Sequence, residues 1–154
     1  MKKNILIGLA LLTFCSCSQQ KIDTKLEGEK VMQTSREWSQ IASTADIEKT
    51  LSYWADDAVV MLAGQPILNG KKDVRKMVEE SFKTPGFKIS WEPQSVQVSE
   101  NGDMAYLIEK ESISMNDSTG KTMTMYSNGV TVWKKQTDGS WKNVVDVSTP
   151  APSK

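Results

Sequence analysis

Residues 104–135 read MAYLIEKESISMNDSTGKTMTMYSNGVTVWKK, two long runs of alternating side chains around a short polar break. The alternation of period two predicts strands at 104–115 and 122–135. The break Asp117-Ser-Thr-Gly120 has the residue types of a hairpin turn, so the two strands should pair antiparallel. Asn128-Gly129 interrupts the second run and predicts a bulge that bends the sheet. Shorter runs on either side extend the sheet with strands near 87–91, 95–98 and 141–148.

Apolar residues at helical spacing precede these strands. They predict a first helix over 31–43, a short second helix near 46–54 and a third helix over 71–82. A strand is expected over 58–62, because that apolar run is too short and too rich in valine for a helix. Helices followed by antiparallel strands indicate an α+β fold, with the helices packed on one face of a curved sheet.

The first residues have the pattern of an export signal. A basic start precedes an apolar run over 5–14, which is shorter than the roughly 20 residues that cross a membrane. The run ends at CSCS (15–18), which resembles a bacterial lipoprotein signal with lipid attachment at Cys17. We expect a signal peptide over 1–16, a lipidated cysteine and tether over 17–30, one domain over 31–148 and a Pro-rich tail over 149–154. The protein is then expected to be exported and anchored in the cell envelope, on the periplasmic or outer-membrane face.

The composition excludes several kinds of chemistry. The 154 residues contain no histidine and only two cysteines, both near the predicted signal. A histidine-dependent triad, a histidine-ligated metal and a thiol nucleophile in the domain are excluded, and we expect no metal and no cofactor. Basic and acidic residues balance at 19 each, and loss of Lys2 and Lys3 with the signal leaves the domain slightly acidic. This balance gives no reason to expect nucleic acid as a partner.

Several short motifs, taken in order, resemble one superfamily. They are Trp38, 53–60 (YWADDAVV), Pro66, 69–71 (NGK), 102–106 (GDMAY), 130–134 (VTVWK) and 138–146 (DGSWKNVVD). Together they resemble the nuclear-transport-factor-2-like, or SnoaL-like, superfamily, and its bacterial branch of unassigned function related to the ketosteroid isomerase group. The resemblance implies a conical, strongly bent antiparallel sheet wrapped around three N-terminal helices. It also implies a pocket at the open end and a homodimer through the outer sheet face.

The resemblance bears on catalysis as well. Ketosteroid isomerase chemistry uses a carboxylate base, a phenol donor and a neutral carboxylic acid donor. The corresponding positions of this sequence hold Leu62, Trp38 and Val130, so none of the three groups is present. This comparison favours a pocket that binds a molecule over one that transforms it.

The candidate site residues are polar and aromatic. Asp146 lies among valines and shares a strand face with Ser148, so we expect it at a pocket rim and keep it as a candidate base. Glu109 is a second candidate base, although a solvated sheet face is our preferred interpretation of Glu109 and Glu111. Asp56-Asp57 is interpreted as part of a turn. The predicted pocket lining is Trp38, Tyr53, Met61, Tyr126, Trp133 and Asp146, with Trp38 or Tyr126 as a hydrogen-bond donor.

The leading hypothesis is a lipid-anchored envelope domain whose apolar pocket binds an apolar small molecule or a partner without catalysis. The first alternative is an isomerase-like or cyclase-like enzyme that transfers protons on a hydrophobic substrate without a cofactor. The second alternative is a structural adaptor that docks another envelope protein on its sheet face.

Overall fold

The structure is a computed structural model that describes residues 21–152. Its helices are α1 (Thr24–Ala42), α2 (Ile47–Leu51) and α3 (Lys71–Lys83). Its strands are β1 (Trp54–Leu62), β2 (Leu68–Asn69), β3 (Lys88–Val98), β4 (Met104–Asn116), β5 (Thr122–Lys135) and β6 (Trp141–Pro150). The predicted signal peptide and Cys17 lie outside the described residues.

The six strands form one sheet in the order β2-β1-β6-β5-β4-β3. Strands β3 to β6 follow one another as antiparallel neighbours, as the alternating runs predict. The turn between β4 and β5 forms for the expected reason, because the Asp117 carboxylate accepts the backbone N–H groups of Thr119 and Lys121. Strand β1 pairs with β6 in parallel, so the sheet is mixed, and α3 lies on the connection that leads from β1 and β2 back to β3.

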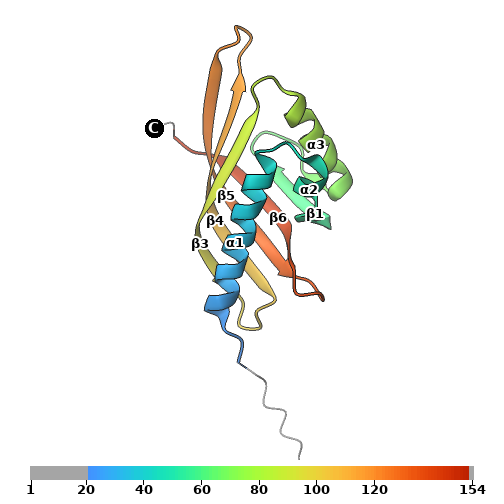
Figure 1. Ribbon diagram of the computed structural model, residues 1–154, viewed down its shortest axis with the longest axis vertical. Helices are drawn as coiled ribbons and strands as arrows, with labels where there is room; N and C mark the ends of the chain where they lie inside the picture. The colour runs from blue at the N-terminus through green and yellow to red at the C-terminus, as the bar shows by residue number, and fades with distance from the viewer. Residues whose placement is uncertain (1–20, 153–154) are drawn as a thin grey trace, which may run out of the picture.

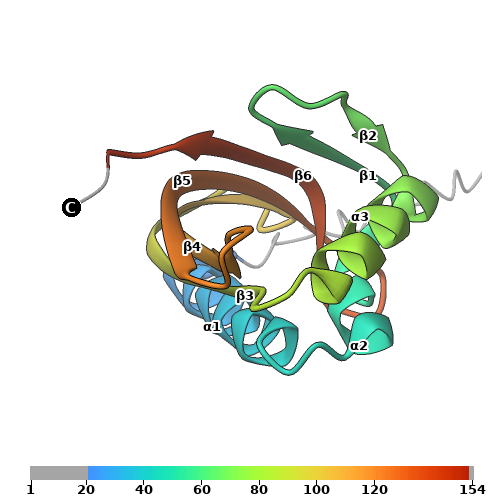
Figure 2. The ribbon, with the colours of Figure 1, turned by 90° about the horizontal axis from the view of Figure 1, so that it is seen from above.

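The sheet curves strongly, and all three helices lie on its concave side (Figures 1 and 2). Helix α1 runs along β3, while α3 lies across the end of the sheet formed by β1. The core between them joins Val31 and Trp38 of α1, Val74 of α3, and Leu107 and Trp133 of the sheet. The predicted α+β cone around three N-terminal helices is therefore confirmed.

Helix α1 begins earlier than the sequence pattern predicts, so residues 24–30 of the expected tether are helical. Asp23 caps the helix, because its carboxylate accepts the backbone N–H groups of Lys25 and Leu26. One turn later Glu27 is buried and forms a 2.7 Å ion pair with Lys135 of β5. This ion pair joins the start of α1 to the sheet. The early start of α1 could not be predicted from the sequence, because residues 24–30 lack the apolar periodicity of a helix.

Two predictions about the strands were wrong. Asn128-Gly129 pairs with Lys110 and Glu109 without a bulge; the register shifts lie in β1, in β3 and near Trp133 instead. Strand β6 continues to Pro150, two residues into the expected tail. Pro150 is tolerated there because it lies beyond the last residue of β6 that pairs with β1, so that edge needs no N–H donor. On the other side, the backbone N–H of Ala151 donates to the Tyr126 carbonyl at 2.8 Å and continues the pairing with β5.

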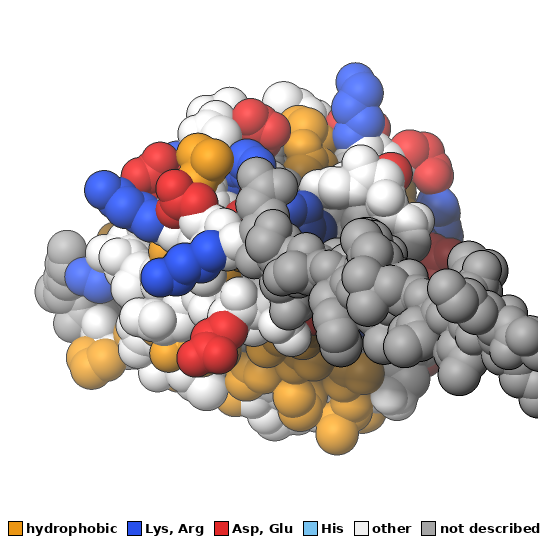
Figure 3. All heavy atoms as spheres, turned by 90° about the horizontal axis from the view of Figure 1, so that it is seen from below, with side chains coloured by type: hydrophobic (Ala, Val, Ile, Leu, Met, Phe, Trp, Pro, Cys, Tyr) orange, Lys and Arg blue, Asp and Glu red, His pale blue; other side chains and the backbone are white. Residues whose placement is uncertain are grey.

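The outer, convex face of the sheet carries exposed apolar side chains from β4 and β5. They are Tyr106, Ile108, Tyr126 and Val130. Hydrophobic side chains also gather along one side of the molecule in the view from below (Figure 3). None of the helices in residues 21–152 is long and apolar enough to cross a membrane.

Candidate functional site

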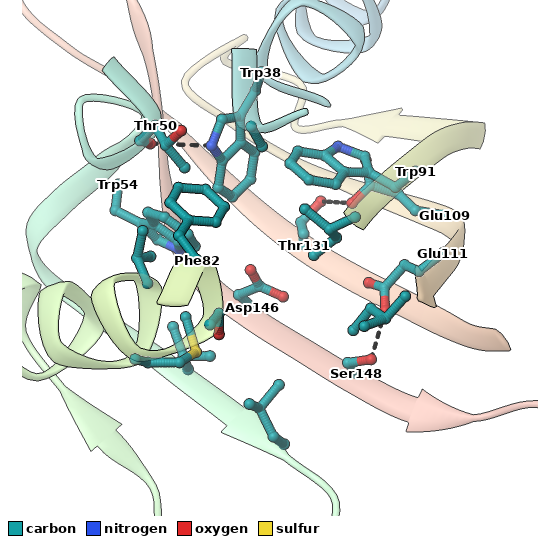
Figure 4. A pocket seen from close by; sticks show the side chains of 18 of the residues that line it. Trp38, Thr50, Trp54, Phe82, Trp91, Glu109, Glu111, Thr131, Asp146 and Ser148 are labelled. Carbon is teal, nitrogen blue, oxygen red and sulfur yellow. Dashed lines mark hydrogen bonds between the residues drawn. The ribbon is translucent and has the colours of Figure 1, made fainter. Parts of the chain in front are cut away.

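A cavity of about 150 Å³ lies between the concave sheet face and the helices. Its wall is mostly apolar, and three acidic side chains project from the sheet into it (Figure 4). The aromatic and aliphatic lining consists of Trp38, Ala42, Trp54, Val60, Leu62, Met77, Val78, Phe82, Phe87, Ile89, Trp91 and Ile113. The polar lining consists of Thr50, Ser81, Glu109, Glu111, Thr131, Asp146 and Ser148.

Glu109 of β4 is held by two hydroxyl groups, one on each carboxylate oxygen. Ser35 of α1 donates to Oε1, and Thr131 of β5 donates to Oε2 at 2.9 Å. The Ser35 hydroxyl oxygen in turn accepts the indole N–H of Trp91 at 3.0 Å. The Thr131 hydroxyl oxygen accepts the indole N–H of Trp133 at 2.9 Å. With both oxygens accepting, this pattern is that of an ionised carboxylate.

The environment of Glu109 opposes its charge. Burial raises the pKa of Glu109, and the hydrogen bonds from Ser35 and Thr131 act against that rise. Its side chain is only 2% exposed. Both of its oxygens accept hydrogen bonds within the wall, so the carboxyl group of Glu109 is held between Ser35 and Thr131.

Glu111 lies two residues further along the same face of β4. Ser148 of β6 donates to its Oε2 at 2.5 Å, and burial raises the pKa of this carboxyl. Its other oxygen occupies the space that a side chain at Gly129 would fill, since a Cβ there would overlap Oε1. Gly129, the residue that suggested a bulge, therefore makes room for an acidic side chain in the cavity.

Asp146 of β6 is the third acid, and of the three its ionised form is stabilised least by its surroundings. Burial among apolar groups, together with the charges of Glu111 and Glu109, raises the pKa of Asp146 to about 8. The indole N–H of Trp54 is the one neighbouring group that opposes the rise. A pKa near 8 favours the protonated carboxylic acid at neutral pH, in a cavity whose wall is mostly apolar.

Trp38 forms the centre of the aromatic wall. Its ring contacts those of Trp54, Trp91 and Trp133 edge to face, with centroids 4.5, 4.8 and 5.7 Å apart. Its indole N–H donates to the Thr50 carbonyl at 3.0 Å. Trp38 therefore lines the cavity as an apolar surface, and its N–H, predicted as a donor to a ligand, is engaged by the Thr50 carbonyl in this structure.

The predicted pocket residues fall into two groups. Trp38 and Asp146 line the cavity, whereas four others do not: Tyr53, Met61, Tyr126 and Trp133. Tyr126 and Met61 follow the strand alternation to the opposite face from Thr131 and Val60, and Tyr126 is exposed. Trp133 is fully buried behind Thr131, and Tyr53 stacks on Trp38 just before β1. These four are therefore packing or surface residues.

The acidic residues of the sequence also separate into two groups. Glu109 and Glu111 lie on the concave face, so the interpretation of a solvated face was wrong. Asp56 and Asp57 are exposed on β1, and Asp56 forms an ion pair with Lys71 at 2.7 Å. Within residues 21–152 no group of three or more Asp, Glu, Cys or His side chains is arranged so that it could hold a metal ion.

Sequence reasoning missed several lining residues. Trp54 was assigned to the second helix but begins β1, and Trp91 lies on β3 beside Ser35 of α1. The strand pattern contained two signals, because residues two apart lie on the same face of a strand. Glu111 therefore lies on the face of Glu109, and Ser148 lies on the face of Asp146. Ser35 carried no signal, because its role depends on how α1 packs across the sheet.

A conical sheet, three helices and an internal cavity together form the nuclear-transport-factor-2-like fold. The sequence profile of the SnoaL-like domain matches residues 31–152. The chain therefore belongs to the SnoaL-like domain family, as its motifs predict.

Solved structures support the same fold. A ketosteroid isomerase-like protein from Erwinia carotovora atroseptica is 22% identical, with a TM-score of 0.68 over 80% of this chain and 95% of that one. An NTF2-like superfamily protein from Salmonella enterica serovar Typhimurium is 11% identical, with a TM-score of 0.69 over 84% and 94%. An NTF2-like protein from Novosphingobium aromaticivorans is 14% identical, with a TM-score of 0.65 over 84% and 86%. No curated protein matches the chain.

Proposed function

We propose that the domain binds one small apolar molecule in the cavity and carries out no chemistry on it. The observation that carries this proposal is the wall of the cavity, which has five aromatic side chains and a volume of about 150 Å³. An engineered apolar cavity of about that size in another protein binds benzene, so the volume suits a small aromatic hydrocarbon. Such a cavity gains binding energy from every apolar contact that replaces water.

The state of the two candidate bases, Glu109 and Asp146, favours binding over proton transfer. Glu109 has both oxygens paired, and Asp146 already holds a proton at neutral pH, so neither is a free base. The three positions that correspond to the isomerase groups also lack them. Leu62 and Trp38 line the cavity without acid–base groups, while Val130 faces outward between Gly129 and Thr131.

The proposal predicts that indane, a two-ring hydrocarbon, binds in the cavity. The indole N–H signals in NMR spectra report on this directly, because Trp38, Trp54 and Trp91 line the cavity and Trp141 does not. Indane should shift the first three signals and leave Trp141 in place. Ser81→Trp, which places an indole at the cavity wall on α3, should weaken indane binding by about tenfold or more.

Lys83→Trp is the matched control for this titration. It makes the same kind of substitution on α3 at an exposed residue outside the cavity lining, so indane should bind as it does to the wild type. Shifts confined to Trp141, or equal binding by the Ser81→Trp protein, would count against the cavity as the site.

We also propose that the domain is exported and held at a membrane by lipid on Cys17. The support is the sequence alone: a basic start, a short apolar run and a small residue before Cys17. Cys17→Ala should move the protein from the membrane fraction to the soluble fraction of the cells, because a lipoprotein loses its acyl chains with this cysteine. Cys15→Ala is the control and should leave the protein in the membrane fraction; an unchanged distribution of Cys17→Ala would refute the anchor.

The homodimer remains part of the same proposal. Its support is the row of exposed apolar side chains on the convex face, including Tyr106, Ile108 and Val130. A second copy that packs on this face would remove them from water.

A further inference from the structure

The polar groups around the cavity are unbalanced in charge. The lining contains three carboxyl groups and no lysine or arginine. None of Glu109, Glu111 and Asp146 forms a salt bridge with any residue in the range 21–152. Buried charges in proteins are normally paired, so this cavity has an uncompensated attraction for positive charge.

Two buried polar groups of the lining have no partner among the described residues. Thr50 is 3% exposed and its Oγ1 makes no hydrogen bond, so its lone pairs are available to an N–H donor. Trp54 is 5% exposed, and its Nε1 has no hydrogen-bond partner within residues 21–152. That nitrogen lies on the side of the ring toward Asp146, where its N–H would support an ionised carboxylate (Figure 4).

The rest of the wall also suits a cation. Indole and phenyl faces attract cations through their negative π surfaces, and the attraction grows when water is excluded. Trp38, Trp54 and Trp91 supply indoles, and Phe82 and Phe87 supply phenyl rings at the side of α3. An ammonium group on a small apolar body would therefore find both of its preferred partners, carboxylates and aromatic rings, in one cavity.

From this geometry we propose that the cavity selects a small organic cation, a protonated amine on an apolar ring, with its ammonium group between Asp146 and Glu111. Glu111 contributes the oxygen that Ser148 leaves free, and the ring of the amine fills the aromatic wall. The inference rests on the proposed function, because it specifies the polar group of a ligand that the same cavity binds.

Proton release follows from the proposal. The empty cavity keeps a proton on Asp146, whose pKa is raised to about 8, and an ammonium ion takes the place of that proton. The titratable groups near it are Glu109 and Glu111 of β4; Glu92 of β3 lies further out, paired with Arg36. The lining residues from α1, α2, α3, β1 and β5 are uncharged. Each amine therefore releases about one proton, and its affinity rises about tenfold per pH unit below pH 8.

The experiment compares three probes on one skeleton: indane, 1-indanone and 1-aminoindane. Calorimetry at pH 6.5 and 7.5, in buffers of different ionisation enthalpy, gives the affinity and the number of protons released. We expect 1-aminoindane to bind at least about tenfold more tightly than indane at pH 7.5, with release of about one proton. We also expect its affinity to fall by up to about tenfold at pH 6.5.

Two variants locate the effect. Asp146→Asn should abolish proton release and remove the preference for the amine over indane. Glu111→Gln should lower the amine affinity but keep proton release. This variant tests the second carboxyl group of the proposed ammonium site, which lies on β4 and not on β6. Asp57→Asn removes the same charge from an exposed position on β1 and should leave all three affinities unchanged.

The outcomes separate the two proposals. Tighter binding of indanone or indane than of the amine overturns the cation assignment and leaves the binding function standing. Amine binding without proton release, or an unchanged preference in Asp146→Asn, also overturns it. Failure of all three probes to bind overturns the cation assignment together with the proposed function.

Discussion

Replacing Trp38 with alanine should lower the free energy of unfolding by about 3–5 kcal/mol. The side chain is 2% exposed and contacts three other indoles edge to face, so its removal leaves a large void next to the existing cavity. The Thr50 carbonyl also loses its hydrogen bond from the indole N–H. Urea unfolding followed by circular dichroism measures the change.

Tyr106→Ala is the control for this effect, because Tyr106 is an aromatic residue exposed on the convex face of β4. Its replacement should change the unfolding free energy of the monomer by no more than about 0.5 kcal/mol. Equal effects of the two substitutions would mean that the indole cluster is not the centre of the core.

Asp146→Asn should make the protein more stable at pH 8 by several kcal/mol and leave its stability near pH 4 almost unchanged. In the folded protein the pKa of Asp146 is about 8, whereas its ordinary value is 3.8. Between these pH values the folded state holds a proton that the unfolded state has released. The wild type therefore loses stability as the pH rises, by up to about 1.4 kcal/mol per pH unit from this one group.

Urea unfolding at pH 4, 6 and 8 tests the prediction. Asparagine cannot ionise, so the variant should show a much flatter dependence on pH than the wild type. The slope that remains has the same sign, because burial also raises the pKa values of Glu109 and Glu111. Asp57→Asn should keep the full wild-type slope; a wild-type slope in Asp146→Asn would show that Asp146 is ionised in the folded protein at neutral pH.

Much of the fold could be predicted from the sequence because its signals are local. Turn residues such as Asp117 and Gly120 separate the long runs, and each run alternates with the period of a strand. The parallel pairing of β1 with β6 had no such signal. It joins residues about 85 apart in the chain, and only the packing of the whole domain brings them together.

The candidate site was less predictable, because it depends on which strand face is concave. The alternation grouped Glu109 with Leu107 correctly, but the usual preference of acidic residues for water suggested a solvated face. In this protein the cost of burying Glu109 is offset by Ser35 and Thr131, which come from other elements. Tyr126 and Met61 were placed in the pocket for their size, although their positions in the alternation turn them outward.

The central claim is that the concave cavity is a binding site for a small apolar molecule. The most direct measurement is an isotope-filtered NMR experiment that detects contacts between unlabelled indane and labelled methyl groups. The account predicts intermolecular contacts to Val60, Leu62 and Val78, whose side chains line the cavity. Contacts to Ile108 and Val130 alone, which lie exposed on the convex face, would contradict it.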